Sequence, residues 1–510
     1  MNSTTNNTNL RNTLSATKDA QTYIEPLIFE KSSLGRTGVS LPTDHNDLIL
    51  DLPNQLLRDQ STLTLPEVSE PDVVRHFTRL STWNYAIDLN LYPLGSCTMK
   101  YNPRLNEEIA ALPHFAHSHP SMPEAYVQPQ LKVIYELQSY LTQLTDMKAA
   151  TLQPAAGAHG ELAGLFLIQA YHHKKNENRN IILIPDSAHG TNPATCTLAG
   201  YKVQELKSGP NGMIDIDALK SALNSDVAGL MITNPNTLGV FERSIAQAAE
   251  LLHQNGSLLY MDGANFNAII GKASLGKMGV DVCHLNLHKT FSTPHGGGGP
   301  GAAAVVVSDR LVPFLPAPLV QKTTNQLGQD VYSWFTPQHS IGRMKAGPGH
   351  FGVLIRALTY ILTYGNEIHK IAEMATLNAN IVRNELKDVL QLASNSDSMH
   401  EAVFSDASFK KTGFDTLTLA KALIDYGYHP PTVYFPLIVS GALMIEPTET
   451  ESAETIRHFT DVVKDILNRM NNQDETLRQL PLRAPVTRVD EVAAARNPIL
   501  NYFTNKNNQE

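Results

Sequence analysis

The sequence predicts an α/β protein: a mostly parallel β-sheet with helices on both faces, followed by a smaller α+β domain. Short apolar runs alternate with helical segments between residues 181 and 308, as in consecutive βαβ units. From about residue 330 the pattern changes to long helices with a few short strands. The length of 510 residues suits two large domains with terminal extensions.

Composition excludes several classes of protein. Hydrophobic residues make up 42% and charged residues 17%, with 31 Gly and 30 Pro, so collagen-like and disordered chains are excluded. The net charge of −9 without a basic block argues against nucleic acid as a partner. No run of eighteen apolar residues occurs, so we expect no membrane span. Three scattered cysteines favour a reducing compartment and a cytoplasmic location: Cys97, Cys196 and Cys283.

The pattern divides the chain into four segments. Residues 1–75 form a polar tail and an extended arm interrupted by prolines, whose start lacks the apolar core of a secretion signal. Residues 76–330 form the large domain and residues 331–485 the small domain. Residues 486–510 form a second polar tail.

Six strands are expected in the large domain, because short apolar runs end at polar or turn-forming residues. They are Ile181–Ile184, Lys202–Leu206, Val227–Thr233, Ser257–Met261, Asp281–Asn286 and Ala302–Ser308. Helical spacing is found in Glu161–Tyr171, Asp215–Leu223 and Ser244–Asn255, and Gly256 stops the last of these.

The small domain is expected to contain three helices and three strands. The helices are Phe351–Tyr364, Ile368–Leu390 and Thr448–Met470, and the strands are His400–Ser405, Tyr434–Val439 and Leu443–Ile445. Thr448 and Glu451 have the spacing of a capping box at the start of the third helix.

Polar residues follow the predicted strands, and ligands of open parallel sheets bind beyond the carboxyl ends of strands. Asp262 follows one strand, and Lys289 follows the next, 27 residues later. A lysine amine can form a Schiff base with pyridoxal phosphate, while an acid pairs with its pyridinium nitrogen. His189 and Asn234 follow two other strands. The pattern therefore predicts a pyridoxal-phosphate site at this edge.

A helix N-terminus is also expected for the phosphate, because its backbone N–H groups bind anions. The segment from Gln153 to Gly160 opens a helix and contains small residues that permit close approach. Taken singly, each of these residues has a structural interpretation, since a lysine after a strand is usually a surface residue and a lone Asp is often a turn residue. Their occurrence at successive strand ends favours a shared site.

Three other motifs bear on alternative functions. Gly297–Ala302 matches G-x-G-x-x-A, but it precedes a strand instead of opening a helix, so a dinucleotide site is not expected. No P-loop sequence occurs. The histidines His114, His117 and His119 could bind a metal, although they lie in a Pro-flanked loop without a supporting carboxylate.

One segment carries a specific resemblance. The sequence His284-Leu-Asn-Leu-His-Lys289, continuing to Pro300, resembles the cofactor-lysine region of glycine dehydrogenase (decarboxylating), the P-protein of the glycine cleavage system, and in particular subunit 2 of its split form. Other segments agree: Tyr92–Pro103, Leu152–Leu162, Pro185–Ala194, Thr233–Glu242, Met261–Ile269, Tyr428–Thr432 and Leu443–Glu451.

The resemblance implies fold type I of the pyridoxal-phosphate enzymes and assigns roles to residues. Lys289 would carry the cofactor, Asp262 would pair with its ring nitrogen, and His189 and Ala264 would lie on either side of the ring. The remaining expected cofactor contacts are Gly157 and Ala158 beside the phosphate, His288 nearby, and Asn234 or Asn236 at the phenolic oxygen. The glycine carboxylate has no assigned partner, with Lys100 and His295 as candidates.

The implied reaction is decarboxylation of glycine, with transfer of the aminomethyl group to the lipoyl arm of the H-protein. Subunit 1 is the implied partner, in an α2β2 heterotetramer. Two alternatives remain open at this point: a non-catalytic fold type I scaffold and, on the histidines of residues 114–119, a metal hydrolase.

Overall fold

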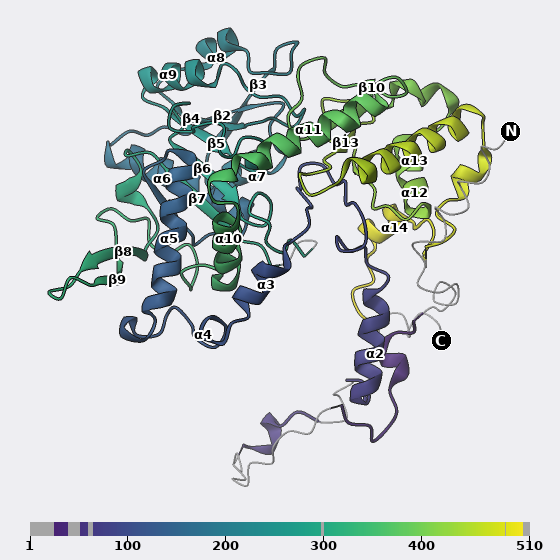
Figure 1. The fold of residues 1–510 in the computed structure, drawn as a ribbon, viewed down its shortest axis with the longest axis horizontal. Helices are drawn as coiled ribbons and strands as arrows, with labels where there is room; N and C mark the ends of the chain where they lie inside the picture. Colours follow the sequence, from purple (N-terminus) through teal and green to yellow (C-terminus); the bar gives the residue numbers. More distant parts are fainter. Residues whose placement is uncertain (1–24, 39–51, 60–64, 297–299, 485, 503–510) are drawn as a thin grey trace. The chain divides into compact units, whose positions relative to one another are not determined.

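The computed structural model describes residues 25–38, 52–59, 65–296, 300–484 and 486–502 (Figure 1). The chain divides into two compact units. The smaller unit comprises Met1–Leu89, Ile424–Gly427 and Glu475–Glu510, and the larger unit comprises Asn90–Leu423 and Tyr428–Asp474. The segment boundaries expected at residues 75, 330 and 485 stay predictions.

A seven-stranded sheet forms the centre of the larger unit, with strand order β1-β7-β6-β5-β4-β2-β3 (Figure 1). Strands β2 to β6 run parallel to one another, whereas β7 is antiparallel to both β6 and β1. The predicted, mostly parallel sheet is confirmed. Its strands are β1 Ala149–Thr151, β2 Ile181–Pro185, β3 Lys202–Leu206, β4 Val227–Thr233, β5 Leu258–Asp262, β6 Val282–Asn286 and β7 Ala303–Val307.

Helices cover both faces of this sheet. Successive residues of a strand point to opposite sides, so each strand contributes to two cores. In β5, Leu259 and Met261 belong to one hydrophobic core, and Leu258 and Tyr260 belong to the other. Helices α5, α8, α9 and α10 contribute to the first core, and α6 and α7 contribute to the second. The bounds are α5 Gln128–Thr145, α6 Gly157–Lys174, α7 Thr191–Leu198, α8 Ile216–Ala222, α9 Ile245–Asn255 and α10 Phe351–Tyr364.

Helix α6 lies close to β5 at Gly164. A Cβ atom added to Gly164 would overlap the ring of Tyr260. We therefore expect Gly164→Ala to lower the free energy of unfolding by about 1–3 kcal/mol, as overpacked cores do. Urea unfolding measures this change. Gly347→Ala is the control, because a Cβ there meets no atom within 4 Å; equal effects of the two substitutions would contradict the close packing.

A second, four-stranded antiparallel sheet follows in the chain, with strand order β10-β11-β13-β12. Its strands are β10 Gln391–Leu392, β11 Ala402–Ser405, β12 Thr432–Val433 and β13 Leu443–Ile445. The helices near it in sequence are α11 His369–Leu386, α12 Thr416–Asp425 and α13 Ala453–Asn471. The remaining elements of the larger unit are the hairpin β8 Leu319–Thr324 and β9 Asp330–Phe335, the helices α3 Arg104–Ala110 and α4 Pro113–Ala116, and short 3-10 turns.

The strand predicted over Tyr434–Val439 is wrong. The chain leaves the sheet after β12, and residues 434–441 form turns. Tyr434 has a φ of 57°, outside the extended region. Pro436 has no N–H group to donate to a neighbouring strand. The apolar composition of the segment therefore does not make it a strand.

The capping box predicted at Thr448 and Glu451 is also wrong. Helix α13 begins later, where the Ser452 side chain caps it by accepting the Thr455 N–H at 3.1 Å. Thr448 has a φ of 65°, and its hydroxyl accepts the Thr450 N–H at 3.3 Å. The segment before Ser452 is therefore a loop.

The smaller unit contains α2 Glu70–Ser81, whose start is capped by Ser69. Glu25 is buried beside this helix and contacts Lys31, His76 and Arg79. The hydrogen bond from Arg79 holds the pKa of Glu25 far below its usual range, against the effect of burial. Other described regular elements are η1 Ile28–Lys31, η2 Asn54–Leu56, η10 Glu475–Gln479 and α14 Glu491–Arg496.

Regular structure is sparse in the described part of the predicted arm, 25–38, 52–59 and 65–75, where only η1, η2 and the beginning of α2 occur. Among the described residues, no helix combines the length and the apolar content that crossing a bilayer requires.

Candidate active site

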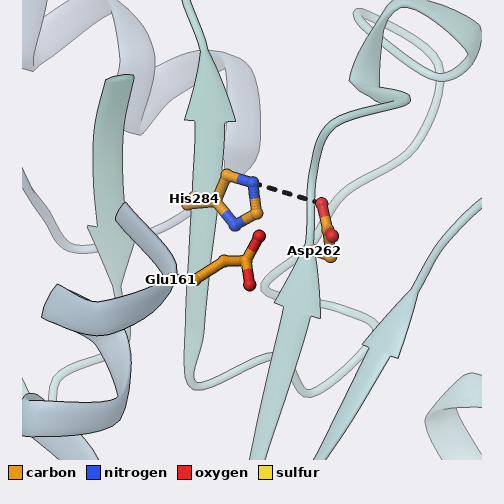
Figure 2. A group of neighbouring side chains, drawn as sticks. All are labelled: Glu161, Asp262 and His284. Atoms are coloured by element: carbon orange, nitrogen blue, oxygen red, sulfur yellow. Dashed lines mark ion pairs between the residues drawn. The ribbon is translucent and has the colours of Figure 1, made fainter. Parts of the chain in front are cut away.

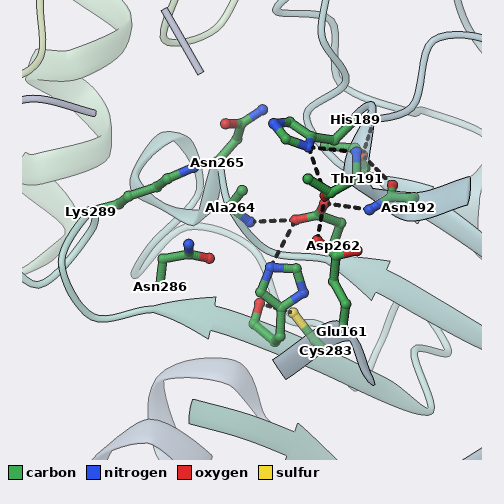
Figure 3. A network of polar contacts seen from close by, with 12 residues as sticks. Glu161, His189, Thr191, Asn192, Asp262, Ala264, Asn265, Cys283, Asn286 and Lys289 are labelled. Carbon is green, nitrogen blue, oxygen red and sulfur yellow. Dashed lines mark hydrogen bonds and ion pairs between the residues drawn. The ribbon is translucent and has the colours of Figure 1, made fainter. Parts of the chain in front are cut away.

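Four strands end at the same edge of the large sheet and bring the predicted residues together (Figure 3). Strand β5 ends at Asp262, and its neighbour β6 ends at Asn286, three residues before Lys289. His189 and Asn234 follow the ends of β2 and β4. The sheet order therefore explains why residues from distant parts of the sequence meet.

Asp262 is buried and accepts hydrogen bonds on both oxygens (Figure 3). Its Oδ1 accepts the Ala264 N–H at 2.9 Å and lies 3.2 Å from Nε2 of His284, and its Oδ2 accepts Nδ2–H of Asn192 at 3.0 Å. Burial alone would raise the pKa of Asp262, but His284, His189 and these hydrogen bonds lower it. Asp262 is therefore an ionised carboxylate at neutral pH.

His284 connects Asp262 to a buried tyrosine. The Tyr260 hydroxyl lies 2.7 Å from Nδ1 of His284. Burial raises the pKa of Tyr260 well above its usual value, so the hydroxyl keeps its proton and can donate a hydrogen bond to Nδ1. Nε2 of His284 then carries the hydrogen that points to Asp262. Sequence reasoning missed His284, although a histidine inside an apolar strand was a signal that could have found it.

Glu161 completes a group of three with Asp262 and His284, whose ligand-type atoms lie within 4.8 Å of one another (Figure 2). The carboxylate of Glu161 accepts the hydroxyl of Thr191 at 2.6 Å and that of Thr195 at 2.9 Å. Because these acids already have hydrogen-bond partners, the group is explained as a polar network without a metal.

His189 lies beside Asp262 in this network (Figure 3). Its backbone N–H donates to the Thr233 hydroxyl at 3.1 Å, and its Nδ1 lies 2.9 Å from the Thr191 hydroxyl. Burial lowers the pKa of His189, and the nearby Asp262 opposes this only in part. A neutral, fixed imidazole is suited to lie flat against an aromatic ring.

Lys289 is 6% exposed, and its Nζ donates to the Ser96 carbonyl at 2.7 Å. Its neighbour His288 contacts Ala302, with Nδ1 3.1 Å from the carbonyl oxygen. Burial lowers the pKa of His288 to about 4, so its imidazole is neutral. Ser96 was not singled out from the sequence.

Helix α6 begins one turn earlier than predicted, which places Gly157 and Ala158 in its first turn. No side chain caps this end, so backbone N–H groups remain available there. A Cβ atom at Gly157 would lie 2.5 Å from Nδ2 of Asn286. Nδ2 of Asn286 also lies 3.4 Å from Nε2 of His288, while its Oδ1 has no partner among the described residues. This end of α6 is suited to an anion.

The two candidate asparagines differ. Oδ1 of Asn234 accepts the Glu242 N–H at 3.1 Å, while its buried Nδ2 has no partner in the described chain. Asn236 uses its whole amide inside the protein, donating to the Gly212 carbonyl and to Glu242 and accepting the N–H groups of Leu238 and Val240. Asn234 is therefore the one with a free donor.

The two candidates for the glycine carboxylate differ as well. Nζ of Lys100 donates to the Thr290 carbonyl at 2.7 Å, to the Tyr360 hydroxyl at 3.0 Å and to Glu449. Its three hydrogens are thus used inside the protein. His295 is half-buried, and its Nδ1 has no partner among the described residues. Gly297–Gly299, which follow it, lie outside the described residues.

The metal-hydrolase alternative gains no support in the described part of the chain. Groups of three or more His, Cys, Asp or Glu close enough to share an ion are found there only around Asp262 and around His400. His114, His117 and His119 belong to neither group.

Two family models match the chain. Residues 371–482 match "Glycine dehydrogenase, C-terminal domain", and residues 160–320 match "Aminotransferase class-V". Proteins named probable glycine dehydrogenase (decarboxylating) subunit 2 from Alkaliphilus oremlandii and Aquifex aeolicus are 51% and 50% identical to it, over 93% of this chain and 98% of each relative. The chain belongs to the glycine dehydrogenase (decarboxylating) subunit 2 family. The predicted membership, and with it the predicted enzyme class, is confirmed.

Solved structures agree with the fold of this glycine dehydrogenase family member. A crystal structure of glycine decarboxylase (P-protein) of the glycine cleavage system in inhibitor-bound form has a TM-score of 0.71, with 19% identity, over 83% of this chain and 95% of that one. A NifS-like protein has a TM-score of 0.58 at 14% identity, over 74% of this chain and 99% of its own. The predicted fold class is confirmed.

Proposed function

We propose that the chain is the lysine-bearing subunit of a pyridoxal-phosphate-dependent glycine dehydrogenase. It would decarboxylate glycine and pass the aminomethyl group to the lipoyl arm of the H-protein. The observation that carries this proposal is the position of two buried residues at neighbouring strand ends. Ionised Asp262 ends β5, and Lys289 follows the end of β6. The sequence relatives, named glycine dehydrogenase (decarboxylating) subunit 2, support the decarboxylation of glycine.

The residues present fit pyridoxal phosphate. Two buried polar atoms, Nδ2 of Asn234 and Oδ1 of Asn286, have no partner in the described chain. The uncapped first turn of α6, at Gly157 and Ala158, offers backbone N–H groups, and Asn286 leaves no room for a side chain at Gly157. An oxygen-rich ligand with an anionic end would satisfy these groups.

Each residue has a proposed task. Lys289 would hold the cofactor covalently, and Asp262 would accept a hydrogen bond from its protonated ring nitrogen. Pyridoxal phosphate, when bound, supplies a conjugated ring that takes up the electron pair left by departing CO2. His189 and Ala264 would flank the ring. The phosphate would lie at Gly157 and Ala158 with His288 nearby, and Nδ2 of Asn234 would donate to the phenolic oxygen.

The charge on Asp262 matters most for this chemistry. The hydrogen bonds from Asn192 and Ala264 and the oriented Nε2–H of His284 keep it ionised despite burial. An ionised acid keeps a proton on the ring nitrogen, which strengthens the ring as an electron acceptor. For the glycine carboxylate we propose His295, because Lys100 is already paired with Glu449.

Visible absorption of the purified full chain tests the function. We expect a yellow band that changes when glycine is added in the presence of subunit 1. Bound zinc without colour would point to a metal hydrolase instead, and colour that never responds to glycine would point to a non-catalytic scaffold.

The partners are part of the proposal. We propose an α2β2 assembly with subunit 1, because relatives of this chain are named as subunit 2, which implies a subunit 1. We also propose a cytoplasmic location, which suits the three free cysteines.

Reconstitution tests the partnership. The chain alone should bind pyridoxal phosphate, yet exchange the carboxyl carbon of glycine with CO2 only slowly. Addition of subunit 1 and lipoylated H-protein should restore exchange, measured with labelled bicarbonate. H-protein without the lipoyl group is the control. Full exchange by the chain with H-protein alone would refute the two-subunit site.

A further inference from the structure

The carbonyl that receives Lys289 belongs to a loop with an unusual backbone. Ser96 and Thr98 have φ values of 65° and 46°, in the left-handed region that residues other than glycine rarely occupy. Between them lies Cys97, and the Ser96 carbonyl accepts Nζ–H of Lys289 at 2.7 Å. Such a backbone persists only where surrounding groups hold it.

Two buried glutamates supply those groups. Glu401, which directly precedes β11, accepts the Ser96 N–H on Oε2 at 3.1 Å. Glu446, which directly follows β13, accepts the Thr98 N–H on Oε2 at 3.2 Å and the Thr98 hydroxyl on Oε1 at 2.6 Å. Both glutamates are fully buried. Two carboxyl groups beside strands of the four-stranded sheet therefore hold the loop whose carbonyl accepts the hydrogen bond from the Lys289 amine.

The loop is also tied to the small sheet by its backbone. The Glu446 N–H donates to the Pro93 carbonyl at 3.3 Å, and the Thr432 hydroxyl donates to the Gly95 carbonyl at 2.8 Å. Leu94 forms an isolated bridge with Ile445 of β13. These contacts fix the approach to the loop, while the N–H groups of the two left-handed residues are held by the glutamates.

The two carboxyl groups influence each other's ionisation. Burial, and the presence of Glu446, raise the pKa of Glu401, and burial also raises that of Glu446, so ionisation of both carboxyl groups at once is disfavoured. Burial lowers the pKa of His400 to about 3, so its ring is neutral. Lys289, Lys100 and Cys97 are other titratable groups that interact with the pair.

We propose that Glu401 and Glu446 are positioning residues for Lys289. They accept hydrogen bonds from the N–H groups of Ser96 and Thr98 and so orient the Ser96 carbonyl toward the Lys289 amine. This carbonyl then holds the amine in one position whenever the amine is not bonded to the cofactor. The role assigned to Lys289 rests on the proposed function, but the loop contacts do not.

The test compares two substitutions at Glu401 in the full chain without cofactor. Glu401→Ala removes the acceptor, whereas Glu401→Gln keeps an oxygen for the Ser96 N–H. We expect amide hydrogen exchange in a peptide covering residues 94–100 to rise at least tenfold in Glu401→Ala. We also expect acetylation of the Lys289 amine, followed by mass spectrometry, to become about tenfold faster. Glu401→Gln should match wild type in both.

Asp281→Asn is the matched control. Asp281 is also a fully buried carboxylate that accepts a backbone N–H, from Leu259 at 2.9 Å, but it stands at the opposite end of β5 and β6. The Asp281→Asn substitution should lower the midpoint of unfolding without changing the rate of acetylation of Lys289. If Glu401→Ala does not fold, Thr98→Val takes its place: loss of the hydroxyl donated to Glu446 should raise acetylation about threefold.

Three results would overturn the proposal. The first is unchanged acetylation in Glu401→Ala, or in Thr98→Val where it replaces that variant. The second is an equal effect of Glu401→Ala and Glu401→Gln, since the acceptor would then be irrelevant. The third is one divalent ion per chain that is lost in Glu446→Gln, because His400 and Oε1 of Glu401 have no hydrogen-bond partner in the described residues and could bind a metal with Glu446. A failure of the proposed function would show separately, as wild-type chain that binds no pyridoxal phosphate.

Discussion

Replacement of Lys289 with alanine is expected to abolish covalent binding of pyridoxal phosphate and all decarboxylation of glycine. Among the described residues, the other buried lysine is Lys100, whose amine is bound by Glu449, Thr290 and Tyr360. No buried amine is therefore free to take the place of Lys289. Borohydride reduction of cofactor-loaded chain, followed by peptide mass spectrometry, should find the pyridoxyl group on residue 289 in wild type and on no lysine in the variant.

Lys277→Ala is the control for this experiment, because Lys277 is exposed on the surface. It should keep both the adduct at Lys289 and the exchange of carboxyl carbon with CO2. A pyridoxyl adduct on another lysine of the Lys289→Ala chain, accompanied by turnover, would contradict the assignment.

Asp262→Asn is expected to lower turnover about 10²–10³-fold, or about 2.7–4 kcal/mol, as the loss of a preorganised electrostatic group does. The amide keeps the shape of the side chain but carries no charge to hold a proton on the ring nitrogen. It also turns an NH2 group toward one of the donors from Asn192, Ala264 and His284. Cofactor should remain bound through Lys289 and the first turn of α6.

Turnover and the visible spectrum of the Asp262→Asn chain, both measured with subunit 1 and H-protein, test this expectation. Asp281→Asn is again the isosteric control, since it exchanges a buried acid for an amide at the far end of the adjacent strand. Near-normal turnover in Asp262→Asn would mean that the acid is only structural.

Much of the large sheet could be predicted because local sequence determines it. The strand Val227–Thr233 is an apolar run buried at every position, and its predicted bounds agree with β4. Helix α9 ends at Gly256 as expected, with the glycine in a left-handed conformation. Asp262 and Lys289 could be recognised because each follows such a strand, and parallel strands end at one edge.

The missed residues depend on contacts that local sequence does not contain. Ser96 is held by Glu401, 305 residues later, and Thr98 by Glu446, 348 residues later. The sequence around Ser96 and Thr98 does not predict their left-handed backbone, because that conformation depends on hydrogen bonds to these distant glutamates. The wrong strand at Tyr434–Val439 has the converse cause, since its apolar residues suggest a sheet that its backbone leaves.

The antiparallel strand β7 has a consequence for biosynthesis. Within the sheet, β1 pairs with β7 alone, so β1 stays unpaired from residue 151 until residues 305–307 have left the ribosome. At about 5–20 residues per second, the roughly 150 intervening residues take about 8–30 s to make. Throughout that interval the apolar face of α5, which packs against β1, is available to chaperones and proteases. The nascent chain is therefore most vulnerable before β7 emerges, and a ribosome stalled ahead of residue 303 would expose a half-finished sheet.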